Sequence, residues 1–402
     1  MLRPSMSWLI LFNRNSVKIM ITILGGEMLC ALGDKPQRLT ALRTGISPLS
    51  SVKVNVGGKE LIYPYYRIDD GSRISDHTIV TGYCKQIVSD LLQQNFTAGP
   101  LALDYSRVGL FLGLSAIDYS LAWPIEEAVD SSFVSRCRRE RVGGGYYLAS
   151  LRQTFGFSGP SLTFNTACTS SANALLGAAS LLASKVIDYA LVLGLELYSP
   201  TTLEGFALMQ LLADSKARPF AEDRNGIVLG EAVSVCLLSR DDIAPSKWSL
   251  AGGVSACETW SVTGTDPSGS GFARVMRGAL AKSQVPPEAI TLIKAHGTAS
   301  ELNDRAEMRG IEQVFTDIPP YLSLKPWFGH TLGACGVAEL LLLKECVDSG
   351  FIPAALNSTP LDAEFVQAPL AEKMVIDNGC FMLNYFGFGG NNSSLVVSKA
   401  GS

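Results

Sequence analysis

The sequence predicts an α/β fold in which a mainly parallel sheet is buried between helices. Short continuous apolar runs, typical of buried strands, alternate with stretches of helical periodicity along the 402-residue chain. Hydrophobic residues make up 47% of the chain and charged residues only 17%, a balance that favours a sheet covered on both faces. This length favours two domains or one large duplicated domain, although no internal repeat is visible in the sequence.

The first half of the fold is expected to span residues 19–245, after a leader or disordered extension at 1–18. The apolar run at 8–12 in that leader is too short for the core of a typical signal peptide. Gly25 and Gly26 are expected to form a turn, and alternating valines between 52 and 56 indicate an extended segment. Strands are expected at 19–24, 107–114, 162–165, 189–195 and 232–238, and helices at 36–43, at 76–94 and after Cys168.

The second half is expected to span residues 246–402, because the composition turns polar around 243–245. A Gly/Ser-rich stretch at 264–271 indicates a loop. The alternation of strands and helices continues in this half, as the α/β interpretation requires. Strands are expected at 248–254, 290–295, 381–388 and 394–398, and a helix at 272–283.

Charge, cysteine content and hydropathy exclude several classes of protein. A net charge of −4 and a pI near 5.6 argue against a nucleic-acid binder, which usually has a basic balance. Nine cysteines without a C-x-x-C pair fit free thiols in a reducing compartment, so we expect a cytoplasmic protein. No apolar run approaches the roughly 18 residues that a membrane-spanning helix requires, and no membrane span is expected.

Cys168 lies between a short apolar strand at 162–165 and a helix rich in small and apolar residues. A strand-to-helix turn with one cysteine at its apex is the layout of a nucleophile elbow. The helix N-terminus favours thiolate over thiol, and the turn lifts the sulfur clear of the sheet. A lone cysteine among small residues is more often simply buried, so this interpretation depends on the residues that accompany it.

Two of the three histidines, His296 and His330, lie beside glycines after apolar strands. Neither belongs to a metal-binding spacing such as H-E-x-x-H, so no metal site is expected. A glycine-rich segment at 386–391 lets the backbone approach a substrate closely, or forms only a tight turn before the last strand. These segments and Cys168 together indicate a catalytic site.

From about Met20 to the C-terminus, the sequence resembles the beta-ketoacyl synthases, the condensing enzymes of fatty-acid and polyketide synthesis in the thiolase superfamily. The resemblance rests on short segments that occur in the family's order. It implies a five-layer αβαβα fold of two duplicated halves, usually in a dimer. The segments are Thr166-Ala167-Cys168, Arg218-Pro219-Phe220 with Asp223-Arg224, Gly226 and Gly230-Glu231, Ala295-His296-Gly297-Thr298 with Asn303-Asp304, Lys325 with Gly329-His330, and Phe386-Gly387-Phe388-Gly389-Gly390-Asn391.

By this resemblance, Cys168 is the nucleophile that takes an acyl group from the thioester of an acyl carrier protein. His296 and His330 bind the malonyl thioester carbonyl and stabilise the enolate that forms as CO2 leaves. Such a condensation places negative charge on oxygen twice, so it needs preorganised donors rather than a strong base. The family also implies an oxyanion hole formed by the N–H groups of Cys168 and Phe388, a gate at Phe388 flanked by Gly387 and Gly389, and support from Lys325, Glu307 and Asp304.

The implied activity is that of a beta-ketoacyl-ACP synthase, an acyltransferase of fatty-acid or specialised polyketide or polyene biosynthesis. No bound cofactor is implied, because the acyl carrier protein supplies the phosphopantetheine thioester. The partner subunit is expected to be identical or a related ketosynthase-like chain. Carrier proteins of this pathway are acidic, so a basic cluster is a candidate docking site, with a merely solvated face as the alternative. The cluster consists of Arg136, Arg138, Arg139 and Arg141.

Two departures from the family pattern keep another function open. Pro326-Trp327-Phe328 stands where the family commonly has small or hydroxyl residues, and its aromatics are expected to reshape the malonyl or pantetheine side of the site. Cys257-Glu258-Thr259-Trp260 replaces a stretch that commonly reads Asp-Ala-aromatic-His. The alternative is a catalytically silent partner subunit similar to chain-length factors, which typically lack the cysteine. A degradative thiolase is disfavoured, because it would carry a second cysteine in the glycine-rich loop.

Overall fold

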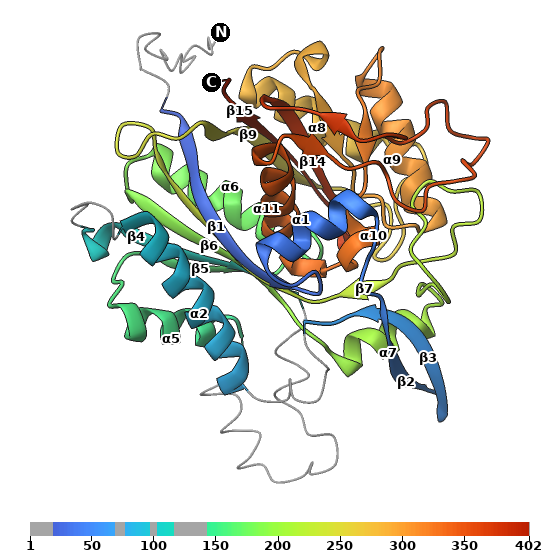
Figure 1. The fold of residues 1–402 in the computed structure, drawn as a ribbon, viewed down its shortest axis with the longest axis horizontal. Helices are drawn as coiled ribbons and strands as arrows, with labels where there is room; N and C mark the ends of the chain where they lie inside the picture. The colour runs from blue at the N-terminus through green and yellow to red at the C-terminus, as the bar shows by residue number, and fades with distance from the viewer. Residues whose placement is uncertain (1–18, 69–76, 97–102, 116–142, 402) are drawn as a thin grey trace, which may run out of the picture.

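A computed structural model describes residues 19–68, 77–96, 103–115 and 143–401 (Figure 1). Ten strands of these residues form one large sheet, and a hairpin of β2 (Ser50–Val56) and β3 (Lys59–Tyr66) lies beside it. In chain order, the strands of the large sheet are β1 (Ile21–Cys30), β4 (Val108–Gly113), β5 (Ser161–Phe164), β6 (Tyr189–Glu196), β8 (Ala232–Arg240), β9 (Trp248–Cys257), β10 (Leu292–Lys294), β11 (Tyr321–Leu322), β14 (Gly379–Phe386) and β15 (Asn391–Lys399).

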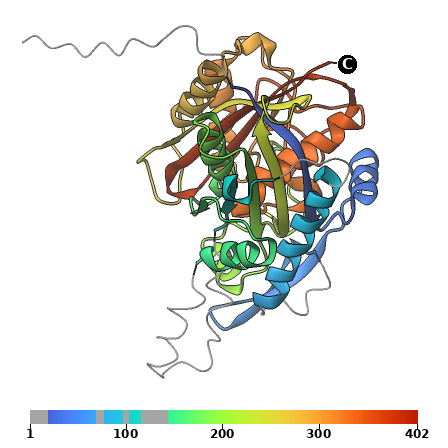
Figure 2. The ribbon, with the colours of Figure 1, turned by 90° about the vertical axis from the view of Figure 1, so that its left-hand side faces the viewer.

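The helices form three layers around and between these strands (Figures 1 and 2). In chain order they are α1 (Lys35–Thr44), α2 (His77–Phe96), α5 (Gly145–Phe155), α6 (Ser170–Ala183), α7 (Pro200–Leu208), α8 (Ser270–Ser283), α9 (Glu301–Val314), α10 (Lys325–Phe328) and α11 (Cys335–Asp348). The shorter elements are β7 (Leu229–Gly230), β12 (Phe351–Ile352), β13 (Met374–Val375) and the 3-10 turns η1 (Tyr105–Arg107), η2 (Pro287–Ala289), η3 (Leu332–Ala334) and η4 (Phe388–Gly390). No helix of the described residues is both long and apolar enough to cross a membrane.

The large sheet consists of two sets of five strands with the same topology. Its spatial order is β11-β10-β14-β15-β9 for one set, continued by β1-β8-β6-β4-β5 for the other. If the strands of each set are numbered along the chain, both sets have the order 3-2-4-5-1 counted from their outer edge. The sets join where β1 pairs with β9, through Ile21 with Leu250 and Thr22 with Ser249. The duplication that the sequence does not display is therefore plain in the strand order.

Helices α6 and α11 pack against each other between the two sets of strands, as the centre of Figure 1 shows. Helices α2 and α5 cover the outer face of the first set, and α8 and α9 cover the second. The layers are thus αβαβα, which confirms the predicted thiolase-like fold. Two hydrogen bonds join the starts of the central helices: Cys335 Sγ donates to the Cys168 carbonyl at 2.9 Å, and Val337 N donates to Ser171 Oγ at 3.2 Å.

The prediction of mainly parallel pairing is wrong, because the sheet is mixed. Strand β4 pairs in parallel with β5 and β6, and β10 with β11 and β14, whereas the other five pairings are antiparallel. Strands β14 and β15 follow one another through a four-residue loop at 387–390. A connection this short reverses the chain and permits only antiparallel pairing.

The predicted turn at Gly25 and Gly26 is also wrong, since β1 continues through both residues with a register shift between Ile23 and Gly25. A Cβ atom on Gly26 would lie 2.2 Å from Leu341 Cδ2 and 2.7 Å from the Val235 carbonyl oxygen. The glycine therefore lets α11 pack closely on the sheet. A pair of glycines is compatible with the close approach of a helix to a strand as well as with a turn.

We expect Gly26→Ala to destabilise the protein by about 1–3 kcal/mol, because the added methyl group overpacks a filled contact. Gly82→Ala is the matched control: Gly82 lies in α2, and its added Cβ would have no neighbour within 4 Å. This control should stabilise the helix by about 1 kcal/mol through helix propensity. Urea unfolding of both variants checks the prediction, and equal shifts in one direction would contradict it.

Candidate active site

Cys168 lies in the turn between β5 and α6, two residues before the helix begins. Ala167 has a φ of 51°, a left-handed conformation that costs energy for a residue with a side chain. Ser170 holds the turn, since its Oγ donates to the Ala167 carbonyl at 2.6 Å and accepts from Thr166 N at 2.9 Å. The strained turn is thus fixed locally, and its geometry is that of the predicted nucleophile elbow.

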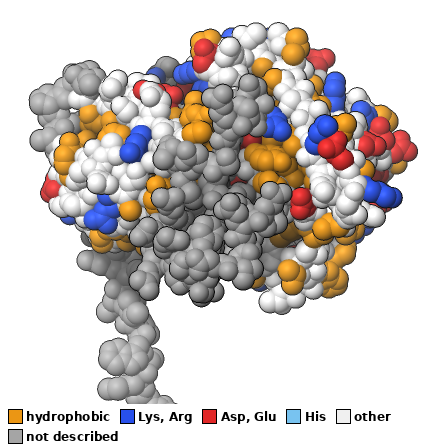
Figure 3. All heavy atoms as spheres, turned by 90° about the horizontal axis from the view of Figure 1, so that it is seen from below, with side chains coloured by type: hydrophobic (Ala, Val, Ile, Leu, Met, Phe, Trp, Pro, Cys, Tyr) orange, Lys and Arg blue, Asp and Glu red, His pale blue; other side chains and the backbone are white. Residues whose placement is uncertain are grey.

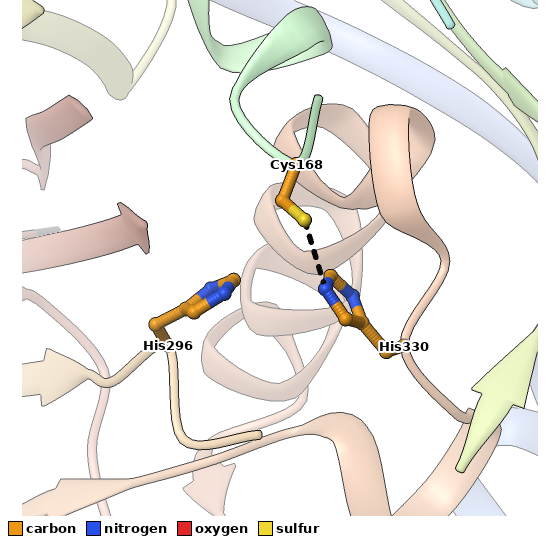
Figure 4. A group of neighbouring side chains, drawn as sticks. All are labelled: Cys168, His296 and His330. Atoms are coloured by element: carbon orange, nitrogen blue, oxygen red, sulfur yellow. Dashed lines mark hydrogen bonds between the residues drawn. The ribbon is translucent and has the colours of Figure 1, made fainter. Parts of the chain in front are cut away.

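The two histidines reach Cys168 from the other half of the fold (Figure 4). His330, which follows α10, places Nε2 3.1 Å from Cys168 Sγ. His296, which follows β10, has its ring centre 5.2 Å from that of His330, with the ring planes at 84°. One ligand-type atom from each of the three residues lies within 4.8 Å of the others. The structure therefore brings together Cys168 and two histidines that lie 128 and 162 positions further along the chain, with α9, β11 and α10 between the two histidines.

Burial controls the protonation of this group. Burial raises the pKa of the Cys168 thiol to about 12, although the nearby Lys325 opposes the shift. Burial also lowers the pKa values of His296 and His330 well below the ordinary value, and Lys325 lowers both further. The resting state is therefore a thiol beside two neutral imidazoles. Burial of the thiol thus opposes the effect expected of the helix N-terminus, which favours the thiolate.

Lys325 fixes the orientation and the tautomer of His296. Its Nζ lies 3.3 Å from His296 Nδ1 and donates to the His296 carbonyl at 2.6 Å and to Glu339 Oε1 at 2.8 Å. An ammonium group has only donors, so Nδ1 accepts and the proton of neutral His296 sits on Nε2. Burial lowers the pKa of Lys325, but Glu339 together with Cys335 and Cys168 raises it by more, and the net pKa is raised.

Glu307 and Asp304 of α9 act on the backbone around His296. Glu307 accepts hydrogen bonds from the N–H groups of His296 and Gly297, both at 2.8 Å. Asp304 accepts from Thr298 N at 3.0 Å and from Phe220 N at 2.9 Å. Burial raises the pKa of Glu307 to about 7 and that of Asp304 to about 6. Both carboxylates hold the loop after β10 in place.

Two buried residues of the site were not singled out from the sequence. Glu339 on α11 is the carboxylate that bonds Lys325, and its other oxygen accepts from Lys294 at the end of β10. Glu339 stands inside an apolar helix, at 0% exposure. A lone acid in such a stretch is the signal that would have found it, because a buried charge needs a partner.

The glycine-rich loop closes the site from the other side. The backbone N–H groups of Phe388 and of Cys168 itself both face Cys168 Sγ, and the rings of Phe388 and Phe206 stack at 5.5 Å. Gly387 has no room for a side chain here, since a Cβ would lie 3.0 Å from Cys168 N. Gly389 adopts a φ of 72°, which glycine tolerates without strain.

Cys168 and both histidines open into a cavity of about 290 Å³. Phe206 and Phe388 also line it, together with polar residues at 263–265 and 298–303. The expectation for the aromatic insertion is not met: Trp327 and Phe328 are buried at 1% and 0% exposure in the core and are not among the lining residues. The bulky side chains of this short helix, which lies between β11 and α11 along the chain, fill the core rather than the site.

The remaining predicted residues lie elsewhere. The segment at 257–260 lines a separate surface hollow with Asp266 and Arg274, and Glu258 N donates to the Gly390 carbonyl at 2.9 Å. Arg136, Arg138, Arg139 and Arg141 lie outside the described residues. On the face seen in Figure 3, basic and acidic side chains of the described residues lie next to one another at the right-hand side.

Two family models match the chain. The model described as "Beta-ketoacyl synthase, N-terminal domain" matches residues 92–244, and the model described as "Beta-ketoacyl synthase, C-terminal domain" matches residues 250–359. The chain belongs to the beta-ketoacyl synthase family. Cys168 lies within the N-terminal match, and His296 and His330 lie within the C-terminal match.

The curated relatives of the chain have the names of 3-oxoacyl-[acyl-carrier-protein] synthases and of polyketide synthases. A 3-oxoacyl-[acyl-carrier-protein] synthase 2 of Coxiella burnetii is 30% identical over 264 residues, which cover 61% of this chain and 63% of the relative. The chloroplastic 3-oxoacyl-[acyl-carrier-protein] synthase II of Arabidopsis thaliana is 28% identical, over 62% of this chain and 49% of the relative. A citrinin polyketide synthase of Monascus ruber is 27% identical, over 73% of this chain and 12% of its own length. The matched part thus spans less than two thirds of each relative.

Solved structures share the fold along almost the whole chain. A ketosynthase (ApeO) in complex with its chain length factor (ApeC) from Xenorhabdus doucetiae matches with a TM-score of 0.76 and 24% identity, over 95% of this chain and 98% of that one. The ishigamide ketosynthase/chain length factor matches with a TM-score of 0.84 and 20% identity, over 96% of this chain and all (100%) of that one. At these identities the likeness shows the fold alone.

Proposed function

We propose that this beta-ketoacyl synthase catalyses decarboxylative condensation of a malonyl thioester with an acyl chain held on Cys168. The observation that carries the proposal is the 3.1 Å contact between Cys168 Sγ and His330 Nε2, beside a second neutral histidine in one cavity. Its relatives are named as 3-oxoacyl synthases and polyketide synthases, and condensation is the reaction these names share. The proposal includes both the synthesis of fatty acids and the synthesis of a specialised polyketide or polyene.

In the first step, the acyl group moves to Cys168. The Cys168 thiol gives its proton to His330 Nε2 as the sulfur attacks the carbonyl carbon of the incoming thioester. The N–H groups of Cys168 and Phe388 bind the carbonyl oxygen while it carries negative charge. The carbon–sulfur bond of the incoming thioester then breaks, and the departing pantetheine thiolate takes the proton from His330.

In the second step, the malonyl thioester loses CO2 and forms the new bond. The electron pair of the breaking carbon–carbon bond moves into an enolate, whose oxygen accepts hydrogen bonds from the two histidines. Nδ1 of His330 has no hydrogen-bond partner among the described residues, so no contact fixes its tautomer and Nε2 can accept in one step and donate in the other. The enolate carbon then attacks the acyl carbonyl, the bond between that carbon and the Cys168 sulfur breaks, and the released thiolate takes a proton from water.

The substrates and partners belong to the same proposal. Both thioesters are carried on the phosphopantetheine arm of an acyl carrier protein, and no separate cofactor takes part. The basic cluster at 136–141 is the proposed docking site for the acidic carrier. The second subunit is an identical chain or a related ketosynthase-like chain, as in the complexes of a ketosynthase with its chain length factor.

Intact-mass spectrometry after incubation with a panel of acyl-carrier thioesters tests the proposal. We expect an acyl adduct on the parent protein and none on Cys168→Ser, with Cys380→Ser as a control that keeps the adduct. The chain length of the preferred adduct identifies the substrate class. If no acyl chain is transferred to the folded parent protein, the proposal fails and the silent-partner alternative takes its place.

A further inference from the structure

A second lysine, Lys294, shares the carboxylate that supports the site. Lys294, Lys325 and Glu339 are buried at 0%, 1% and 0% exposure. Lys325 Nζ donates to Glu339 Oε1, and Lys294 Nζ donates to Glu339 Oε2. The mechanism derived above uses Lys325 alone, so it gives Lys294 no role. A buried charge costs free energy unless it is paired. The presence of a second buried lysine beside one carboxylate therefore needs a physical explanation.

The contacts of Lys294 are those of an ammonium ion. Nζ donates to Glu339 and to the Asn384 carbonyl at 2.6 Å, and it lies 3.8 Å from the centre of the Tyr385 ring. All three partners are electron-rich, and a ring face of this kind attracts a cation. Burial and the charge of Lys325 lower the pKa of Lys294, Glu339 raises it, and the net pKa lies below the ordinary value. A neutral amine would present a lone pair to these three electron-rich groups, so the geometry favours the charged form.

Lys294, Lys325 and their shared carboxylate Glu339 together carry one net positive charge near the histidines, and Glu307, with a pKa of about 7, offsets it only in the fraction of molecules in which it is ionised. Besides the histidines, the groups that interact with these two lysines are Glu339 and Cys335 from α11, Glu307 from α9, Tyr385 from β14 and Cys168 from the turn before α6. Burial is the largest cause of the lowered pKa values of both histidines, and the charges of Lys325 and Lys294 add to it. Without Lys294, the pair of Lys325 and Glu339 would carry no net charge.

We propose that Lys294 is a positioning residue whose positive charge keeps His296 and His330 in the neutral form that the condensation requires. The benefit to condensation rests on the proposed function. The effect of the Lys294 charge on the protonation of the histidines does not. A protonated His330 has no lone pair with which to accept the Cys168 proton. The charge of Lys294 opposes that protonation and so extends activity toward lower pH.

The three histidines of the chain make a direct test practical, because [13C]histidine labelling gives three ring signals. The spectra are recorded as a function of pH for the parent, Lys294→Met and Lys294→Arg, and His296→Asn and His330→Asn assign the signals. We expect both active-site histidines of Lys294→Met to titrate about one pH unit or more above the parent, and those of Lys294→Arg to follow the parent. Lys344→Met, which removes a lysine from an exposed pair with Asp348 on α11, is the matched control.

Unchanged titration of both histidines in folded Lys294→Met would overturn the inference. We expect this variant to fold, because Glu339 keeps its bond to Lys325 and replacement of a buried charge by an apolar side chain is often neutral or stabilising. If it does not fold, Lys294→Gln provides the same comparison. The acid limb of the pH–rate profile should shift by the same amount as the NMR signals. A shifted titration in a protein that condenses no substrate would uphold the electrostatic role and reject the proposed function.

Discussion

Replacement of His330 by alanine is expected to slow acylation of Cys168 by about 10²–10⁴-fold. His330 is the histidine that contacts the sulfur, at 3.1 Å, and the buried thiol has a pKa near 12. Without an acceptor for its proton, very little of the nucleophile forms at neutral pH. His296→Ala should leave acylation nearly unchanged and instead slow malonyl decarboxylation by about 10²–10³-fold, because it removes one preorganised donor.

The two half-reactions are measured separately to check this division. Acylation is followed by mass spectrometry at short times with an acyl-pantetheine donor, and decarboxylation by release of CO2 from malonyl carrier protein. His77→Ala, at the start of α2 on the outside of the sheet, is the control and should behave as the parent. Equal losses in both half-reactions for His296→Ala and His330→Ala would show that the histidines act as one unit and would contradict separate roles.

Glu339→Ala is expected to destabilise the protein by about 3–5 kcal/mol, the usual cost of removing one partner of a buried ion pair. In this case two lysines, Lys294 and Lys325, lose their shared carboxylate at 0–1% exposure. The loss should be larger than for either lysine replaced by methionine, since each of those changes leaves a matched pair. Activity should fall as well, because Lys325 no longer holds His296 in place.

Urea unfolding followed by circular dichroism measures the effect, with Glu364→Ala as the control. Glu364 also bonds an arginine, Arg305, but its side chain is 50% exposed, so water replaces the lost contact and little stability is lost. An unchanged unfolding midpoint for Glu339→Ala would mean that the lysines release their protons instead of remaining charged. In that case the positive charge near the histidines is lost, and the histidines of Glu339→Ala should titrate above the parent.

The strands, the elbow and the histidines could be predicted because each depends on local sequence. The apolar runs around Leu191, Val235 and Val396 predict strands in the right places, and Gly45 ends α1 as the sequence suggests. Gly26 was misread because local sequence does not distinguish a turn from a close approach by a distant helix. Whether β15 runs parallel or antiparallel to its neighbours depends on which strands it pairs with. The periodicity of its side chains does not identify those strands.

The protonation states of the site residues could not be predicted from the sequence for a similar reason. Cys168 precedes a helix, which argues for thiolate, but its pKa depends on burial in the packed structure and on groups as far along the chain as Lys325 and Phe388. Glu339 was not selected because its importance comes from two lysines, Lys294 and Lys325, that lie on other elements. Residue identity and spacing thus locate a reactive group, whereas its protonation follows from the packed structure.

Because α6 and α11 are in contact, the geometry of the active site depends on the relative position of the two halves of the molecule. Cys168 directly precedes α6, and His330 precedes α11 by a single 3-10 turn. A slide of one helix along the other by an ångström would change the Sγ–Nε2 separation from a hydrogen bond of 3.1 Å to a distance at which the proton no longer transfers readily. Ligands or subunits that bind far from the cavity can therefore regulate the chemistry if they shift this helix pair, without touching a residue of the site.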